Sequence, residues 1–120
     1  MAITDVISNA QQGQQYVQDL QSYFSNYLTV QTFVGNYGLQ RFNTLNTAFG
    51  AILIDVQQAT PNTIDIVQTQ LPALQQAIND LLTYDQNYLT VQTFGGNYMT
   101  ERLNWINQAI TVISADPSLV

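Results

Sequence analysis

The sequence contains no cysteine and no histidine. Without cysteine there is no disulfide and no thiolate nucleophile, and without histidine the commonest metal ligand and the usual base for catalysis near neutral pH are missing. Zinc sites built from Cys and His and arrangements of the Ser-His-Asp type are therefore excluded. The eight acidic residues are scattered and mostly lie off the apolar positions. We expect them on a solvated face, and we predict no catalytic residue, no cofactor and no metal.

Positive charge is almost absent as well. The only basic residues are Arg41 and Arg102, and the formal net charge is −6. Two arginines cannot neutralise the phosphates that a nucleic-acid-binding surface must contact, so we predict no nucleic-acid partner. An anionic membrane surface is disfavoured for the same reason.

Charged residues of either sign make up only 8% of the chain, against about a quarter in ordinary soluble domains. The polar surface must instead consist of Gln, Asn, Thr and Ser. Such a surface has little of the charge repulsion that keeps protein molecules apart, so we expect self-association.

Long apolar runs are missing too. The longest, residues 48–54, is broken by Gly50 and is far shorter than the roughly twenty residues of a membrane-spanning helix. We therefore predict no membrane span. The first residues, MAITDVISNAQQ, contain no basic cluster and no apolar core, so we do not expect an uncleaved secretory signal.

One segment of the sequence occurs twice. Residues 26–37 read NYLTVQTFVGNY and residues 87–98 read NYLTVQTFGGNY, so twelve residues recur sixty-one positions later with one difference, Val34 against Gly95. The same offset relates further identical pairs: Gln14/Gln75, Asp19/Asp80, Tyr23/Tyr84, Arg41/Arg102 and Asp55/Asp116. Self-similarity at a fixed offset is the mark of a repeated structural unit.

A chain of 120 residues has the size of one ordinary domain, and a unit half as long would be only marginally stable alone. We predict a single domain, residues 1–120, in which two repeats of about 1–60 and 61–120 share one core.

Apolar residues recur at steps of three and four, which is the period of one helix face. The pattern predicts helices at about 5–33, 37–56, 61–92 and 100–116, with a kink or a new start at Pro72. The inward positions are expected to include Val6, Ala10, Val17, Leu20, Leu39, Phe42, Leu45, Phe49, Ile52, Ile64, Val67, Leu71, Leu74, Ile78, Leu81, Met99, Leu103, Ile106, Ile110 and Ile113. Short connections favour antiparallel neighbours. The predicted fold is all-α: tandem duplicated αα-hairpins that form an up-down-up-down four-helix bundle.

Within the repeated segment, YLTVQTF leaves two structures open. It is rich in β-branched and aromatic residues and could alternate as a strand, but its spacing continues the preceding helical stripe, and we favour helix. Gly35-Asn36 and Gly96-Asn97 are expected to end one helix and begin the next, because Gly can adopt the left-handed conformation and Asn is a favoured N-cap. Between the repeats, either Thr60 or Thr63 is expected to cap the third helix.

Aromatic residues gather around the two repeated turns, in a larger number than the end of a small bundle can bury. Since Tyr is enriched in the cores of protein interfaces, we predict an assembly interface there. Its candidate residues are Tyr27, Phe33, Asn36, Tyr37, Arg41, Tyr88, Phe94, Asn97, Tyr98, Arg102 and Trp105. For the two arginines a local role stays open, either with carbonyl groups at a helix end or with an acid of the same molecule. The other interpretation is a contact with Asp19, Asp80 or Asp55 of a neighbouring subunit.

These features predict a structural subunit that assembles with itself, as a filament or sheath outside the cell or in a virus particle. A head-to-tail contact between two near-equivalent surfaces propagates when it does not close. In composition the chain resembles flagellin-type and needle-type secreted subunits, without a shared motif. The alternative is a small helical binding module that grips a partner protein or a glycan through its two equivalent turn regions. An enzyme is not expected.

Overall fold

The computed structural model describes residues 3–27, 33–88 and 94–119, and every regular element within them is helical. In chain order the elements are α1 (Ile3–Tyr27), α2 (Phe33–Val56), α3 (Thr63–Asp65), the π-helical turn η1 (Ile66–Gln70), α4 (Leu71–Tyr88), α5 (Phe94–Ser114) and the 3-10 turn η2 (Pro117–Leu119). The prediction of an all-α chain is confirmed for the described residues.

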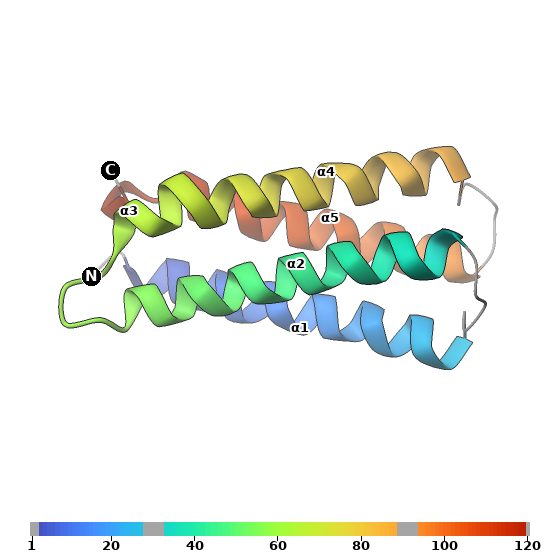
Figure 1. The fold of residues 1–120 in the computed structure, drawn as a ribbon, viewed down its shortest axis with the longest axis horizontal. Coiled ribbons are helices and arrows are strands. Elements are labelled where there is room, and N and C mark those ends of the chain that lie inside the picture. The colour runs from blue at the N-terminus through green and yellow to red at the C-terminus, as the bar shows by residue number, and fades with distance from the viewer. Residues whose placement is uncertain (1–2, 28–32, 89–93, 120) are drawn as a thin grey trace.

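The four long helices lie side by side along the long axis of a molecule that measures 44 × 20 × 19 Å (Figure 1). α1 packs against α2 and α5, and α4 packs against the same two helices. Both chain termini and the joint between α2 and α3 lie at one end of the molecule. At the other end α1 and α4 stop and α2 and α5 start (Figure 1). The described part of the chain is therefore a helical bundle, as predicted.

The apolar stripes of the four helices meet in one core. Its members include Val6, Ala10, Val17, Leu20, Phe42, Leu45, Phe49, Ile52, Leu71, Leu74, Ile78, Leu81, Met99, Leu103, Ile106, Ile110 and Ile113. These positions were predicted from the helical period and are confirmed. Burying a large apolar side chain is worth about 1.5–3 kcal/mol, so the shared core stabilises the helices far more than their intrinsic propensity does.

The turn η1 changes which residues face the core at the start of the third long helix. Ile64 and Val67 were predicted inward, but they are 67% and 42% exposed, and Ile66 is buried instead. The N–H of Leu71 donates to the carbonyl of Ile66, five residues back instead of four, so the wider turn shifts the helical phase. Pro72 follows directly. It cannot donate to the preceding turn, and the predicted interruption of the helix takes the form of this π turn.

One predicted core position in α2 is also wrong. Leu39 is 43% exposed, because the buried stripe runs through Gly38, Phe42 and Leu45. Leu39 lies one residue away from that stripe, which is a rotation of about 100° around the helix.

The joint between the repeats is capped by Asn62, and the prediction of a cap at Thr60 or Thr63 is wrong. The side chain of Asn62 accepts a hydrogen bond from the backbone N–H of Asp65 at 3.2 Å. The backbone N–H of Asn62 donates to the carbonyl of Asp55 at 3.0 Å, which ties the joint to the end of α2. Because Thr63 is already the first residue of α3, the capping position falls to its neighbour.

At the opposite end of the bundle the helix starts differ from the prediction. α2 begins at Phe33 and α5 at Phe94, so Gly35-Asn36 and Gly96-Asn97 lie inside the first turns of these helices and do not separate two helices. No described glycine has a positive φ. The N–H groups of a first helical turn need no intrahelical acceptor, so Gly and Asn are tolerated there. Most of each YLTVQTF segment lies outside the described residues, and its structure stays a prediction.

Candidate functional site

The two arginines each bind an aspartate of the other repeat. Nε of Arg41 lies 3.3 Å from Oδ2 of Asp80, and Nε of Arg102 lies 3.8 Å from Oδ2 of Asp19. The two ion pairs are repeat equivalents, because Arg102 lies sixty-one positions after Arg41 and Asp80 lies sixty-one positions after Asp19. Since α1 touches α5 and α2 touches α4, the two ion pairs join the repeats across opposite sides of the bundle.

Each arginine also covers a tyrosine ring. Cζ of Arg41 lies 3.6 Å from the ring centroid of Tyr37, and Cζ of Arg102 lies 3.6 Å from that of Tyr98. These tyrosines in turn contact rings of the other repeat. Tyr37 meets Tyr84 edge to face, with centroids 4.9 Å apart.

The matching contact in the second cluster is a stacked pair. The ring centroids of Tyr98 and Tyr23 are 4.6 Å apart with an interplanar angle of 25°. A glutamine supports each aspartate as well: Nε2 of Gln15 donates to Asp19 at 3.0 Å, and Nε2 of Gln76 donates to Asp80 at 2.8 Å. We refer to Asp80, Arg41, Tyr37 and Tyr84 as the Arg41 cluster. Asp19, Arg102, Tyr98 and Tyr23 form the Arg102 cluster.

These clusters support the local role predicted for the arginines, and a contact with a neighbouring subunit stays a prediction. Asp19 and Asp80 are among the acids that were predicted as partners, but both meet their arginine within one chain. A partner in the same molecule is therefore confirmed. Four predicted interface residues, Tyr37, Arg41, Tyr98 and Arg102, are thus engaged in contacts between the repeats.

Six of the predicted interface residues are described only by their place on the backbone. Tyr27 and Tyr88 end α1 and α4, Phe33 and Phe94 begin α2 and α5, and Asn36 and Asn97 lie in the first turns of those helices. The structure therefore brings their backbones to the same end of the bundle, as predicted (Figure 1). Their side chains lie outside what the structure describes.

Trp105 is the predicted interface residue that lies apart. It stands on the side of α5, eleven residues beyond its start at Phe94, which is about 16 Å along a helix. Its side chain is 40% exposed. The ring centroid of Tyr16 in α1 lies 5.3 Å away, and Cζ of Arg102 lies 5.1 Å from the Trp105 ring. A shallow hollow of about 210 Å³ runs beside these rings. Its lining residues are Asn9, Gln12, Tyr16, Trp105, Gln108, Ala109 and Val112.

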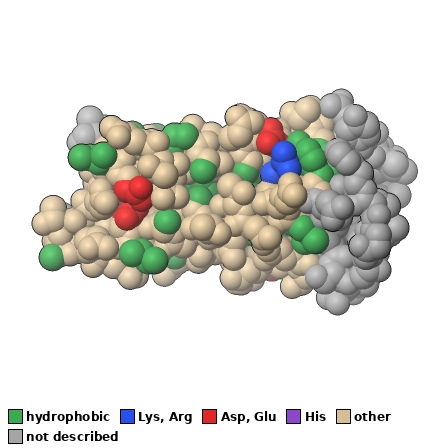
Figure 2. All heavy atoms as spheres, viewed as in Figure 1, with side chains coloured by type: hydrophobic (Ala, Val, Ile, Leu, Met, Phe, Trp, Pro, Cys, Tyr) green, Lys and Arg blue, Asp and Glu red, His purple; other side chains and the backbone are tan. Residues whose placement is uncertain are grey.

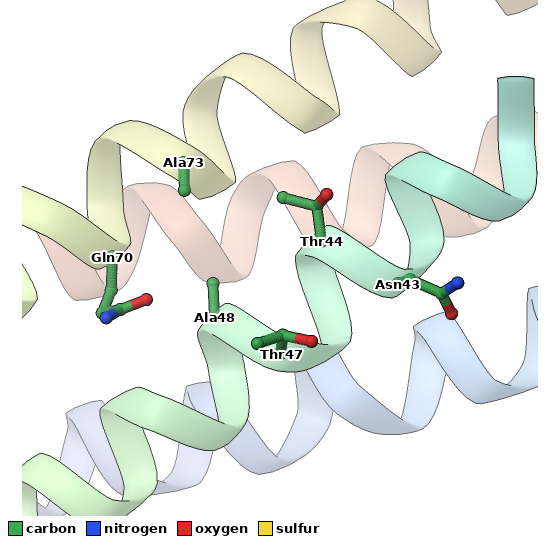
Figure 3. Close-up of a pocket in the computed structure, with 6 residues that line it drawn as sticks. All are labelled: Asn43, Thr44, Thr47, Ala48, Gln70 and Ala73. Carbon is green, nitrogen blue, oxygen red and sulfur yellow. The ribbon is translucent and has the colours of Figure 1, made fainter.

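A larger hollow lies on the opposite side of the bundle, between α2 and α4 with η1. We call it the Thr44 groove, and it has a volume of about 310 Å³. It is lined by Asn43, Thr44, Thr47, Ala48, Gln70 and Ala73. Figure 3 shows Thr44 and Ala48 on the side of α2 that faces α4, with Ala73 and Gln70 pointing back toward α2.

The Thr44 groove continues into a second hollow of about 290 Å³, and the two share Thr44 and Ala73. The ion pair of Arg41 and Asp80 borders this second hollow. On the side of the molecule that Figure 2 displays, charged side chains are sparse, and polar uncharged groups form most of the surface.

The acidic residues are not all solvated, which corrects the prediction. Asp55, Asp85 and Asp116 are 8%, 4% and 5% exposed. Asp116 accepts hydrogen bonds from the N–H and the hydroxyl of Ser118, at 2.8 and 2.6 Å, and closes the turn after α5. Asp85 accepts one from the hydroxyl of Thr100. Local polar partners therefore make the burial of Asp116 tolerable, whereas Oδ1 of Asp85 is buried without a hydrogen-bond partner.

Burial also changes the acidity of two of these carboxyl groups. Burial first, and then the neighbouring carboxyl of Asp65, raise the pKa of Asp55 to about 6. The pKa of Asp65 is lowered, mainly because its side chain receives a hydrogen bond from Asp55. Burial raises the pKa of Asp85 as well, against the opposing hydrogen bond from Thr100.

None of the three buried aspartates lines the hollows described above. In residues 3–27, 33–88 and 94–119 no three carboxylates come together as a metal site would require. Over the same residues, none of the helices has the length and hydropathy needed to cross a membrane.

Comparisons with protein-family models, with curated proteins and with solved structures found no match to this chain.

The sequence reasoning missed the residues that distinguish the two sides of the bundle, namely Tyr16, Thr44, Ala73 and Ala77. A signal for them exists in the repeat alignment. At the offset of sixty-one, Thr44 corresponds to Trp105 and Tyr16 to Ala77, so the repeats differ most in side-chain size at these places.

Proposed function

We propose that this chain is a structural subunit that assembles with copies of itself into an extended polymer of the filament or sheath type. The observation that carries the proposal is a set of large exposed apolar side chains on a surface with very few charges. Exposed fractions of 39% to 67% are found for Leu39, Ile54, Ile64, Val67, Trp105 and Val112. Single exposed apolar residues are common, but a weakly charged surface does little to keep such residues of two molecules apart.

The ion pairs support this proposal by engaging both arginines within one molecule. Both arginines are held by aspartates of the same chain, at 3.3 Å and 3.8 Å. Neither cation is therefore needed to bind an anionic partner. Polar contacts between molecules would have to come from the abundant Gln, Asn and Thr side chains, which carry no net charge and impose no like-charge repulsion.

We further propose that the bundle arose from two tandem αα-hairpins in an up-down-up-down order. The duplicated sequence supports this, as do the reciprocal contacts of the Arg41 cluster and the Arg102 cluster, in which each member of one has its repeat equivalent in the other. A duplicated chain offers two related surfaces on opposite sides of one molecule, which suits a polymer.

A role without catalysis is part of the same proposal, since His and Cys are absent and the buried carboxyl groups line none of the hollows. A location outside the cell or in a virus particle stays a prediction from composition.

Light scattering of the purified chain across a concentration series tests the proposal, with negative-stain microscopy of the highest concentration. We expect the mean mass to grow with concentration and elongated particles to appear. A constant monomer mass over the whole series would contradict self-assembly. It would favour the binding module, which would use the helix ends that carry Tyr27, Tyr88, Phe33 and Phe94 to grip a protein or a glycan.

A further inference from the structure

Two opposite sides of the bundle consist of equivalent positions of the two repeats but differ in the size of some side chains. One side, the α1–α5 face, carries the Arg102 cluster, and the other, the α2–α4 face, carries the Arg41 cluster. The repeat offset relates them position by position. Trp105 on the first face corresponds to Thr44 on the second, and Tyr16 corresponds to Ala77.

The α1–α5 face projects apolar groups. Trp105 and Val112 are 40% and 39% exposed. They are seven residues apart on α5, which places them on the same side of the helix two turns from each other. The ring of Tyr16 lies against Trp105 with the centroids 5.3 Å apart and supports it from α1. This face therefore carries the partly exposed ring of Trp105, here called the projection, beside the partly exposed Val112, and both side chains line the hollow of about 210 Å³.

The α2–α4 face is hollow at the matching positions. Thr44 and Ala51 stand where the first face has Trp105 and Val112, and Ala77 stands in place of Tyr16. Trp105 and Tyr16 correspond to Thr44 and Ala77, which both line the continuation of about 290 Å³. The Thr44 groove of about 310 Å³ (Figure 3) corresponds mostly to the lining of the smaller hollow of about 210 Å³ on the first face, where Trp105 takes the place of Thr44. The groove has a floor of small side chains, including Ala48 and Ala73, and a rim of polar ones.

We propose that the Trp105 side chain of one copy docks into the Thr44 groove of the next copy. This contact rests on the proposed function and names the surfaces that carry it. We assign a second copy of the chain as the occupant because every molecule carries both surfaces. The α2–α4 face has the small Thr44 at the position where the opposite face of the same chain carries Trp105. Aromatic side chains that fill pockets are the residues that contribute most to binding at interfaces.

Charge and size are compatible with this contact. On the α2–α4 face Arg41 and Asp80 cancel, and on the α1–α5 face Arg102 pairs with Asp19 and Glu101, which leaves one negative charge there. One side of the molecule measures about 44 by 20 Å. A standard protein interface buries roughly 800 Å² per partner, so the contact would have to extend over much of such a side.

The symmetry of the contact predicts the form of the assembly. The α1–α5 face and the α2–α4 face share no helix and lie on opposite sides of the bundle. A contact between unlike faces leaves one of each free at the two ends, so it continues as an open chain unless the rotation closes a ring. The bundles would stack side by side, with the polymer axis across the long axis of each molecule.

Two single variants of the full chain test the contact. Thr44→Trp fills the groove but keeps the projection, and Trp105→Thr removes the projection but keeps the groove. Each swaps in the residue found at the equivalent position of the other repeat. We expect both variants to remain monomeric in light scattering at concentrations at which the unmodified chain polymerises. An equimolar mixture is expected to form a one-to-one dimer that grows no further, because one functional projection and one functional groove remain.

The mixture separates a specific contact from a general loss of folding, since misfolded variants do not restore each other's binding. Thr83→Trp, at an exposed position of α4 outside both hollows, is the matched control and should polymerise normally. The inference is overturned if either single variant polymerises like the unmodified chain, if the mixture stays monomeric, or if Thr83→Trp also blocks growth. If the unmodified chain itself never grows, the proposed function fails, and the contact fails with it.

Discussion

A Cβ atom built on Gly13 would stand 2.4 Å from Cζ of Phe49, so α1 approaches the Phe49 ring of α2 as closely as the absence of a side chain allows. Real Cβ contacts do not reach this distance, and the ring belongs to a fully buried residue that cannot move aside into solvent. Gly13 lies in the interior of α1, where glycine costs up to about 1 kcal/mol relative to alanine. The structure shows it to be a packing requirement.

We therefore expect Gly13→Ala to destabilise the fold. Overpacking a filled core lowers the free energy of unfolding by about 1–3 kcal/mol, which outweighs the gain of up to about 1 kcal/mol from replacing glycine in a helix. The measurement is urea unfolding followed by circular dichroism. Gly50→Ala is the matched control, because its nearest neighbour is Nε2 of Gln14 at 3.3 Å, the end of a flexible side chain. It should leave stability unchanged or raise it.

The second repeat suggests a compensating variant. Its equivalents of Gly13 and Phe49 are Leu74 and Ile110, so a large residue on one helix is matched there by a smaller one on the next. We expect the double variant Gly13→Leu with Phe49→Ile to recover most of the stability that Gly13→Leu alone loses. Additive losses in the same unfolding experiment would show that the two positions are not coupled.

Removing the arginines should produce two effects of similar size. The side chains of Arg41 and Arg102 are 27% and 19% exposed, and each combines an ion pair with a tyrosine contact. Partly solvated ion pairs contribute up to about 1 kcal/mol, and arginine–aromatic contacts add about 0.5–1 kcal/mol. We expect Arg41→Gln and Arg102→Gln each to lower unfolding free energy by about 1 kcal/mol, with a smaller loss in high salt.

Charge reversal separates this role from an intermolecular one. Arg41→Glu together with Arg102→Glu should reduce the unfolding free energy further while leaving polymerisation in light scattering intact. Loss of assembly at unchanged stability would instead place the arginines between subunits.

Stability should fall as the pH rises through the range in which Asp55 ionises. Its pKa is raised to about 6 in the folded chain, against about 3.9 in an unfolded one. The folded state then binds more protons than the unfolded state between these values, so the unfolding free energy decreases from about pH 4 to above pH 6. The raised pKa of Asp85 acts in the same direction. Below the unfolded value, the lowered pKa of Asp65 makes stability decrease again as the pH falls.

Thermal unfolding at a series of pH values measures this profile. Asp55→Asn should flatten the decline near pH 6, whereas Asp5→Asn, which removes one charge from an exposed position, should leave the decline in place. An unchanged slope in Asp55→Asn would assign the titration to another group.

Alanine substitutions at Asn62, Thr60 and Thr63 should differ in their effect on stability, because only Asn62 caps the third helix. Asn62→Ala removes the acceptor for the N–H of Asp65 and should lower the unfolding free energy by about 0.5–2 kcal/mol. Thr60→Ala and Thr63→Ala, at positions that the sequence had suggested as caps, should change it by much less. A loss at Thr60 equal to that at Asn62 would contradict the assignment of the cap.

Much of the fold could be predicted from local patterns. The spacing of apolar residues identified the buried stripes of α1, α2, α4 and α5. The duplicated sequence segments indicated a bundle of related hairpins. The errors have local causes. The π turn before Pro72 shifts the register by one residue, so Ile66 replaced Val67 in the core. Gly35 was interpreted as a stop, although the first turn of a helix accepts glycine readily.

The candidate site was less predictable, because it depends on which helices become neighbours. Pairing Arg41 with Asp80 requires α2 to lie beside α4, and no property of either segment alone indicates this. Trp105 was grouped with the helix ends by its place in the sequence, but its distance along α5 puts it on a side of the bundle. Comparing the repeats for differences in side-chain size, as well as for identity, would have found Thr44 and Ala77.

The crossed ion pairs have a consequence for one repeat on its own. One hairpin alone carries an arginine and an aspartate, Arg41 and Asp19, but in the folded protein each of them is bound by the other half. Two identical short chains could form both ion pairs if they packed together as a symmetric dimer. In a chain cut to one repeat, Arg41 and Asp19 would therefore lose these partners, and only the pairing of two such chains would restore them.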